Sequence, residues 1–367
     1  MKIMGKATKF AAVTAIAALA LTGCGRQDAN TDAGAESSAA GFDQGATIGV
    51  ALPQKTSENW VLAENLFNKD LKDAGFKADV QFANGGVAEQ QNQINAMITK
   101  GAKVIIVGAI DGKQLGNQLK AAKEAGATII AYDRLLLNTK DVDYYVAYDN
   151  FKVGQLQGQA LLDGLKEKKG NGPYSIELLA GSPDDANAKV FFDGAMDVLQ
   201  PKIDDGTLKV GSGQKTFEQA VTQGWKAENA QKRMDTILTG NYSGSKKLDG
   251  ILSPNDTLAR AALTSVKAAG KETPIVTGQD SEVESVKSIM KGVQYSTINK
   301  DTRALVEHAT SMVKDLQQGK ELEVNDTESY DNGVKTVPAY LLEPQIVTKA
   351  NVKEAYVNDP VLGPITK

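Results

Sequence analysis

The sequence contains one cysteine, Cys24, and one histidine, His308, among its 367 residues. A single cysteine excludes a disulfide within the chain, and there is no Cys/His cluster with the spacing of a zinc site. His308 lies in the middle of an expected amphipathic helix, where a packed or solvated imidazole is much commoner than a general base. A Gly-x-Ser-x-Gly nucleophile motif is also absent. Because no catalytic set is recognisable, we expect a protein that is not an enzyme.

Apolar runs long enough to span a membrane are missing as well. The run from Phe10 to Leu21 is shorter than the roughly 20 residues that cross a bilayer. It follows a basic start and ends in Leu21-Thr22-Gly23-Cys24, which resembles the lipobox of bacterial lipoproteins. We therefore expect residues 1–23 to be a lipoprotein signal peptide and Cys24 to carry the lipid. An ordinary signal peptide that happens to end near a cysteine is the alternative.

Residues 24–46 differ in composition from the rest of the chain. They are mostly Ala, Gly, Ser, Asp, Asn and Gln, with a single aromatic residue, Phe42. Such a segment cannot bury a core and is typical of a flexible tether. A lipid at Cys24 followed by this tether would hold a folded domain outside the cytoplasm, at the membrane surface.

The whole chain has 41% hydrophobic and 23% charged residues and a formal net charge of −4, values of a globular domain. A charge of this sign gives no reason to expect a nucleic-acid partner.

Short apolar runs alternate with segments of helical periodicity from residue 46 onward. The first half predicts strands at 46–52, 78–83, 104–110, 129–132 and 143–148, with helices at 60–72, 88–100 and 113–124. The second half predicts helices at 151–165, 188–199, 225–238 and 302–316, and strands at 175–180, 208–211, 250–252, 274–277, 294–298 and within 336–347. This alternation indicates an α/β fold of parallel sheets with helices on both faces.

Polar residues follow many of the predicted strands. The clearest case is Ile129 to Arg134, a buried-strand pattern that ends in Asp133 and Arg134. Open parallel sheets bind ligands at the carboxyl ends of their strands. Further strand ends carry Asp111, Asp149 with Asn150, Asp184 to Asn187, Asn255 with Asp256, Asp280, and Asn299 with Lys300. About half of these residues suit helix N-caps, notably Asp149, Asp184 and Asp256, and the others predict a cleft rich in groups that bind hydroxyls.

The two tryptophans, Trp60 and Trp225, add a second signal. One lies in each half of the chain, and each begins a predicted helix after a polar loop. Sugars offer hydroxyls to polar groups and an apolar C–H face to aromatic rings. The pattern favours reversible binding of a polyhydroxylated ligand, with core packing of the two rings as the alternative.

The paired carboxylates Asp184 and Asp185 could serve as the acid and base of a glycosidase. A helix cap and its neighbour is the simpler interpretation of this pair.

Four segments carry a resemblance to a known family: Tyr132-Asp133-Arg134-Leu135, Gly181-Ser182-Pro183-Asp184-Asp185, Gly278-Gln279-Asp280-Ser281-Glu282-Val283 and Lys300-Asp301-Thr302-Arg303. The chain resembles the type I periplasmic sugar-binding proteins, which are solute receptors of ABC importers. It is most similar to their ChvE-type multiple-monosaccharide-binding members, with the xylose-binding members next. The resemblance covers nearly everything from residue 48 to about residue 347.

This resemblance implies two Rossmann-like lobes with parallel sheets, joined by a three-segment hinge. Residues 47–149 with 300–332 would form the N-terminal lobe, and 150–299 with 333–367 the C-terminal lobe. The lobes would close over an aldose such as xylose, arabinose, glucose or galactose. The implied partners are the permease subunits of an ABC importer and, in addition, a sensor protein. No cofactor and no metal are implied.

The resemblance also implies the ligand contacts. Asp133 and Arg134 would be the hydroxyl-binding pair of the first lobe, while Asn255 and Asp280 would be the amide and carboxylate of the second. The remaining implied contacts are Asn187 after the Ser182 loop, Lys300 at a hinge crossing, the stacking rings of Trp60 and Trp225, and the weaker contacts Lys55 and Asp111.

Two other functions stay open at this point. A receptor of the same fold could bind another small polar ligand, such as a nucleoside or an autoinducer, or it could act as a sugar sensor for a signalling receptor. A sugar-responsive repressor shares the lobe pair but needs a DNA-binding module before Ile48, where this chain has a lipobox and a tether.

Overall fold

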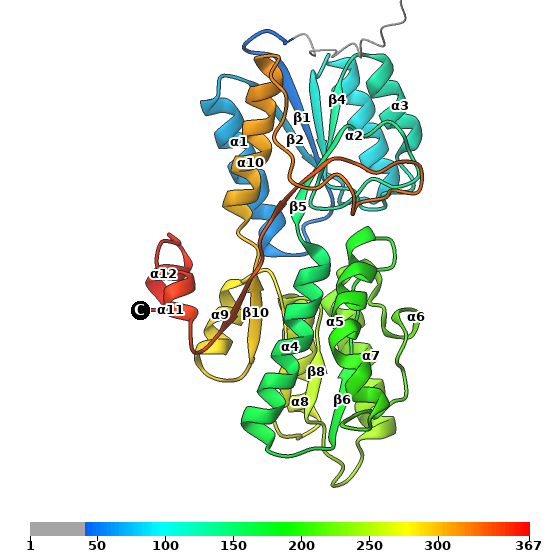
Figure 1. Cartoon of the computed structure of the whole chain (residues 1–367), viewed down its shortest axis with the longest axis vertical. Coiled ribbons are helices and arrows are strands. Elements are labelled where there is room, and N and C mark those ends of the chain that lie inside the picture. The colour runs from blue at the N-terminus through cyan, green and yellow to red at the C-terminus, as the bar shows by residue number, and fades with distance from the viewer. Residues whose placement is uncertain (1–40) are drawn as a thin grey trace, which may run out of the picture. The chain divides into compact units, whose positions relative to one another are not determined.

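The computed structural model describes residues 41–367 (Figure 1). The predicted signal peptide, the lipidation site Cys24 and most of the predicted tether lie outside the described residues. Within 41–367, no helix combines the length and hydropathy that crossing a bilayer requires.

The first sheet has six strands in the order β11-β5-β4-β3-β1-β2, and all neighbouring strands are parallel. Its strands are β1 (Thr47–Leu52), β2 (Lys77–Phe82), β3 (Val104–Val107), β4 (Thr128–Tyr132), β5 (Tyr144–Tyr148) and β11 (Ala339–Leu342). Strands buried on both faces of a parallel sheet are apolar throughout rather than alternating. The sequence of β3, Val-Ile-Ile-Val with every residue buried, follows this rule.

Helices cover both faces of this sheet (Figure 1). Helices α1 (Glu58–Asp73) and α10 (Thr302–Gln317) pack on one face and share a core with it. Helices α2 (Val87–Thr99) and α3 (Gly116–Glu124) pack on the other. We call the six-stranded sheet with these helices the first lobe. Since α10 comes late in the chain, the backbone must return to this lobe after building the other one.

The second lobe contains a four-stranded parallel sheet in the order β7-β6-β8-β9. Its strands are β6 (Tyr174–Leu178), β7 (Leu208–Val210), β8 (Gly250–Leu252) and β9 (Ile275–Val276). Helices α4 and α5 contribute to one core and α7 and α8 to another, on the two sides of the sheet. The helices of this lobe are α4 (Asn150–Lys169), α5 (Ala186–Asp204), α6 (Phe217–Ala220), α7 (Ala227–Asn241), α8 (Asp256–Ala268) and α9 (Val283–Met290), with a 3-10 turn at Gln223–Trp225.

Helices α4 and α5 approach each other at glycines. A Cβ atom on Gly154 would collide with the carbonyl oxygen of Phe191, and one on Gly194 with that of Phe151. These contacts require residues without side chains, because backbone lies directly against backbone. The close packing fixes α5, whose first turn carries Asn187.

The C-terminal part of the chain crosses between the lobes. Strand β10 (Ser296–Asn299) pairs antiparallel with β12 (Gln345–Thr348), and two short helices, α11 (Val352–Ala355) and α12 (Leu362–Ile365), follow. We expected all of residues 333–367 in the C-terminal lobe, but β11 pairs with β5 of the first sheet. The reason is that Val337 and Ala339 are buried in the core between that sheet and α2 and α3, so their segment completes the first lobe before it crosses.

The predicted α/β class with parallel sheets is confirmed. Of the three expected helix caps, only Asp149 is one, since its side chain accepts from the amide of Lys152. Asp185 rather than Asp184 caps α5, and Asn255 rather than Asp256 caps α8. The cap of each of these two helices therefore lies one residue away from the expected cap, which gives the neighbouring residue a different role.

Candidate functional site

A small polar pocket lies between the carboxyl ends of strands from the two lobes. It is lined by Thr56, Ser57, Asn59, Trp60, Asp133 and Arg134 of the first lobe, Asp185, Asn187, Phe191, Trp225, Asn255, Gln279 and Asp280 of the second, and Lys300 at the crossing after β10. Its cavity of about 30 Å³ has room for water but not for a sugar ring. A larger ligand can enter this polar pocket only if its walls move apart.

The polar pocket brings together eight of the ten ligand contacts expected from the sequence: Asp133, Arg134, Asn187, Asn255, Asp280, Lys300, Trp60 and Trp225. It does not include Lys55 or Asp111. Lys55 forms an ion pair of 3.0 Å with Glu64. The carboxylate of Asp111 accepts hydrogen bonds from the Lys113 amide and the Gln114 side chain, which occupy it within its own turn.

The backbone at Asp133 is strained and bonded across the cleft. Its φ angle is 61°, a left-handed backbone conformation that few residues other than glycine adopt easily. Its carbonyl oxygen accepts from the Tyr145 hydroxyl at 2.7 Å and from Asn187 Nδ2 at 2.7 Å. Because Asn187 belongs to the second lobe, the latter bond links the lobes.

Strain recurs around the same pocket. Five described residues other than glycine have a positive φ: Asp133, Asn138, Trp225, Asp280 and Ser281. Asp133, Trp225 and Asp280 line the polar pocket, and Ser281 directly follows Asp280. Conformations of this kind persist where the surrounding structure imposes them, and they concentrate at binding sites.

Five charged side chains, each buried or half-buried, meet in the polar pocket: Asp133, Arg134, Asp185, Asp280 and Lys300. Arg134 Nε lies 2.9 Å from Asp185 Oδ2, and these residues come from opposite lobes. Lys300 Nζ lies 3.2 Å from Asp280 Oδ1. Arg134 Nε and Asp280 Oδ1 nevertheless lack an aligned hydrogen bond to any described residue. Gln279 Oε1, also in the pocket wall, has no partner at all among the described residues, so the pocket can form further hydrogen bonds with a polar ligand.

The pKa values of the pocket respond to this burial. Burial raises the pKa of Asp280, and the nearby Lys300 ammonium offsets part of that effect. Burial alone would lower the pKa of Lys300, but Asp280 and Asp133 outweigh it and raise the pKa above its ordinary value. Burial likewise raises the pKa of Asp185 against the opposing influence of Arg134. The charges therefore depend on one another, because an unpaired ion at this depth is unfavourable.

Both tryptophans are buried, and both line the polar pocket. The guanidinium of Arg134 lies 5.2 Å from the centre of the Trp60 ring, an arrangement that favours a cation–π interaction. Trp225 Nε1 donates a hydrogen bond of 3.0 Å to Asp185 Oδ2. Core packing and pocket lining, which the sequence left as alternatives, are thus combined in each ring.

Sequence reasoning missed a central role of Asp185. Its Oδ1 accepts from the amide of Asn187 as a helix cap, while its Oδ2 contacts both Arg134 and Trp225. The available signals were the motif Gly181 to Asp185 and the polar strand end from Asp184 to Asn187. Phe191, also missed, lies four residues after Asn187 on α5, a spacing that places two side chains on one helix face.

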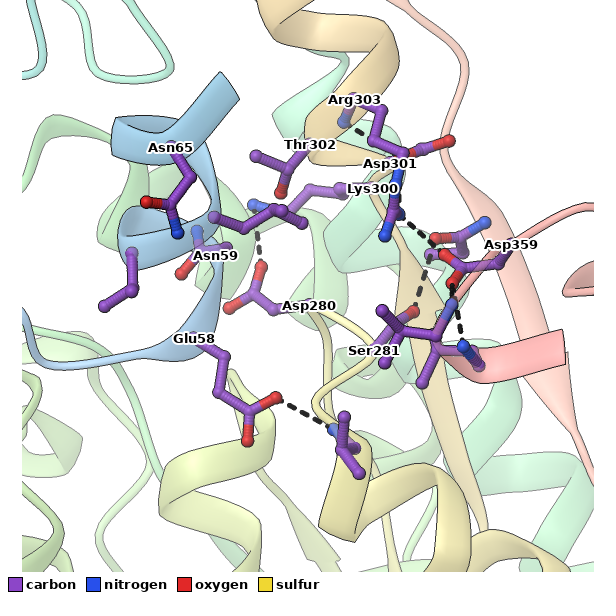
Figure 2. Close-up of a pocket in the computed structure, with 16 residues that line it drawn as sticks. Glu58, Asn59, Asn65, Asp280, Ser281, Lys300, Asp301, Thr302, Arg303 and Asp359 are labelled. Atoms are coloured by element: carbon purple, nitrogen blue, oxygen red, sulfur yellow. Dashed lines mark hydrogen bonds and ion pairs between the residues drawn. The ribbon is translucent and has the colours of Figure 1, made fainter. Parts of the chain in front are cut away.

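A larger cavity of about 370 Å³ adjoins the polar pocket (Figure 2). We call it the hinge pocket; it shares Asn59, Asp280 and Lys300 with the polar pocket and adds residues of α1, α10 and the C-terminal segment. Apolar side chains such as Val61, Leu62 and Val283 line it, which makes it a poorer match for hydroxyl groups than the polar pocket.

One hydrogen bond at the hinge pocket joins the two lobes. Glu58 at the start of α1 accepts from the backbone amide of Val283 at the start of α9, at 3.0 Å (Figure 2). Anions are favoured at a helix N-terminus, where amides are free to donate. Glu58 thus holds the lobes together outside the polar pocket.

Comparison with known proteins defines the class. Residues 48–321 match the model of the periplasmic binding protein domain family. That match covers most of the chain, and the chain belongs to this family. The expected membership among type I periplasmic sugar-binding proteins is confirmed.

Three similar proteins are all named as periplasmic proteins that bind sugars. The chain is 48% identical to the multiple sugar-binding periplasmic receptor ChvE of Rhizobium radiobacter, over 85% of this chain and 89% of that protein. It is 45% identical to the multiple sugar-binding periplasmic protein SbpA of Azospirillum brasilense, over 85% and 88%. It is 36% identical to the D-xylose-binding periplasmic protein of Escherichia coli, over 85% and 89%.

Two solved structures are similar in fold and sequence. One is an ABC transporter solute-binding protein from Clostridium phytofermentans with bound β-D-glucose, at a TM-score of 0.83 and 41% identity, covering 86% of this chain and 98% of that one. The other is a carbohydrate transporter solute-binding protein from Chloroflexus aurantiacus in complex with D-glucose, at a TM-score of 0.79 and 35% identity, covering 87% and 97%.

Proposed function

We propose that this protein is the monosaccharide receptor of an ABC sugar importer and that the polar pocket holds the sugar. The observation that carries the proposal is the set of buried, incompletely bonded polar atoms between the lobes. Gln279 Oε1 can accept and has no partner among the described residues, while Arg134 Nε and Asp280 Oδ1 have only their ion-pair contacts with Asp185 and Lys300. A sugar hydroxyl both donates and accepts, so it can satisfy groups of either kind.

The relatives support an aldose as the ligand. Three relatives are named for binding sugars, and two similar structures hold glucose. We infer that glucose, galactose, xylose or arabinose is the ligand class for this chain. Binding without covalent change suffices for a receptor, and we propose no enzymatic step.

The proposed contacts divide between the lobes. Asp133 and Asp280 would accept from hydroxyls, and Arg134 and Lys300 would donate to them. Asn255 already uses its side-chain oxygen to cap α8 through the amide of Leu258, which leaves its NH₂ group for the ligand. The remaining contacts would be the Asn187 amide and the two rings of Trp60 and Trp225, between which the sugar ring would lie.

Hinge motion gives the ligand access. We propose three crossing segments, which follow β5, β10 and β11, as the hinge between the lobes. The bond from Asn187 to Asp133 and the ion pair of Arg134 with Asp185 would open when the lobes separate. A sugar bound to one lobe would then favour closure, because it adds contacts to the other lobe only in the closed form.

The proposed role in sugar transport implies a cellular location and partner proteins. We propose an extracytoplasmic receptor anchored through a lipid on Cys24, which delivers its sugar to permease subunits of an importer and also informs a sensor protein. The lipobox sequence supports the anchor, and the family supports the importer. Metabolic labelling with an alkyne fatty acid tests the anchor: the wild-type chain should be labelled and Cys24→Ser should not.

Isothermal titration of the purified mature protein tests the ligand. We expect saturable heat and one site per chain with at least one of glucose, galactose, xylose, arabinose and fructose. Adenosine serves as the nucleoside control. Heat with adenosine alone would favour the nucleoside alternative, and heat with none of these five sugars would contradict the proposed function.

A further inference from the structure

Asp256 is a fully buried carboxylate beside the polar pocket but not part of its lining. It is the first residue of α8 and follows Asn255, which does line the pocket. A buried charge without a ligand needs a structural or functional explanation, because its removal from water is unfavourable.

The contacts of Asp256 converge on one loop, residues 279–282. Its Oδ2 accepts from the Glu282 amide at 3.0 Å and from the Thr297 hydroxyl at 2.9 Å. The same hydroxyl accepts from the amide of Ser281 at 3.2 Å. The backbone amide of Asp256 donates to the carbonyl of Gln279 at 3.0 Å. One residue therefore holds both ends of the loop directly and its middle through a single intermediate.

This loop presents Asp280 to the polar pocket. Asp280 and Ser281 have φ angles of 89° and 55°, two consecutive left-handed residues of a kind that persists only where the surrounding structure imposes it. The other carboxylate oxygen of Asp256, Oδ1, accepts from Gln294 Nε2 at 2.7 Å, which fixes the carboxylate itself. There is no free space on that side, since a Cβ atom on Gly278 would collide with Oδ1.

We propose that Asp256 is a positioning residue for sugar binding: it imposes the conformation of residues 279–282 that directs Asp280 into the polar pocket. This inference rests on the proposed function for its affinity measurements. Glu282, the buried carboxylate at the end of this loop, is paired with Arg260 at 2.5 Å and accepts from Thr257, so it does not compensate for a change at Asp256.

Asp256→Asn is the test variant. An amide has only one accepting oxygen, so the variant side chain cannot accept both from Gln294 and from the Glu282 and Thr297 pair. Either Gln294 Nε2 or both the Glu282 amide and the Thr297 hydroxyl then face the NH₂ group of the variant in place of an acceptor, and we expect the Kd for the sugar to rise about tenfold to a hundredfold. A rise of less than about twofold would contradict the proposal.

Glu177→Gln is the matched control. Glu177 is as deeply buried in the same lobe, and its carboxylate accepts from Ser212 and Tyr242, away from the loop. This variant should lose thermal stability but change the Kd by less than about twofold, since it leaves Asp280 in place. An equal loss of affinity in both variants would show that only the stability of the lobe matters and would overturn the proposal.

A double variant tests whether Asp256 acts through Asp280. In an Asp280→Asn background, Asp256→Asn should change the Kd by less than about twofold, because the carboxylate that it positions is already gone. If the effects of the two single substitutions on the Kd instead multiply in the double variant, Asp256 does not act through Asp280.

Amide hydrogen exchange in the protein without sugar gives a measurement independent of the ligand. We expect Asp256→Asn to accelerate exchange in a peptide spanning 278–283 by about tenfold or more, and Glu177→Gln to leave that peptide unchanged. Unchanged exchange in Asp256→Asn overturns the positioning role. If the wild-type protein binds no aldose, the proposed function fails, while the exchange measurement still decides whether Asp256 holds the loop.

Discussion

Lys300 Nζ lies 3.2 Å from Asp280 Oδ1 and 3.8 Å from Asp133 Oδ1, so one ammonium group connects carboxylates of the two lobes. Lys300 itself follows β10, at a point where the chain crosses between the lobes. Its side chain is 7% exposed, as buried as that of Asp280. This arrangement couples the charge balance of the pocket to the relative position of the lobes.

Lys300→Met should leave two buried carboxylates without their cation. Removing one partner of a buried pair typically costs about 3–5 kcal/mol, so we expect both a lower Tm and a loss of sugar affinity of about a hundredfold or more. Calorimetry and thermal unfolding measure the two effects.

Lys55→Met is the control for that variant. Lys55 pairs with Glu64 at the surface and lies outside the polar pocket. Its Kd should stay within about twofold of wild type, since exposed ion pairs contribute little. A large loss of affinity in Lys55→Met would instead return Lys55 to the list of ligand contacts.

Glu58→Gln tests the lobe contact outside the polar pocket. The carboxylate accepts from the Val283 amide and touches no proposed ligand position in the polar pocket. Glutamine keeps an accepting oxygen but removes the charge, so the bond should weaken by about 1 kcal/mol and the Kd should rise severalfold, chiefly through faster sugar release from the closed form. Stopped-flow measurement of release checks this.

Glu64→Gln, on the same helix, is the matched control for Glu58→Gln. Glu64 pairs with Lys55 of its own lobe, so the Glu64→Gln variant should release the sugar at the same rate as wild type. An unchanged release rate in Glu58→Gln would show that this bond does not stabilise closure.

The sequence was informative about strand ends and uninformative about contacts across the lobes. Asp133 and Asp280 each follow a strand of a parallel sheet, and the strand-end rule included them, although it also included Asp111, which lies outside the pocket. Lys300 follows β10, which pairs antiparallel with β12, so its role was indicated by the family resemblance instead. Asp185 could not be selected in this way, because a helix cap is a complete explanation of an Asp at its position. Its pairing with Arg134 depends on the relative placement of two lobes, which no local pattern encodes.

Some expected positions differ from the structure for related reasons. Lys55 and Asp111 follow strands but lie outside the polar pocket and have partners within their own turn or lobe, which a strand-end rule does not reveal. The sequence of the segment 333–342 predicts a short strand but does not indicate which of the two sheets that strand joins. Only its burial against the core beside α2 and α3 assigns it to the first sheet.

The pH dependence of stability follows from the buried carboxyl of Asp256. Burial raises its pKa well above the ordinary value, and neighbouring Glu282 adds to the effect. A raised folded pKa means that the folded state holds the proton more tightly than the unfolded state. Its stabilising contribution is therefore present below about pH 4, the unfolded value, and is lost as the pH rises through the folded value.

Comparison of wild type with Asp256→Asn isolates that contribution. Wild type should be more stable than the variant at pH 5, and the difference should become smaller by pH 7, since only wild type loses the contribution. Urea unfolding at the two pH values measures the free energies. A difference that grows with pH would contradict the assigned direction of the pKa shift.

The most direct test of the central claim is calorimetric titration of Asp133→Ala with the aldose that wild type binds most tightly. The Asp133 side chain is 13% exposed and faces the pocket, while its backbone carbonyl makes the structural bonds to Tyr145 and Asn187. We predict one saturable site in wild type and no detectable binding in the variant, with circular dichroism and a cooperative unfolding transition like those of wild type. Binding of similar affinity in the folded variant would contradict the account, because the polar pocket would then not be the sugar site.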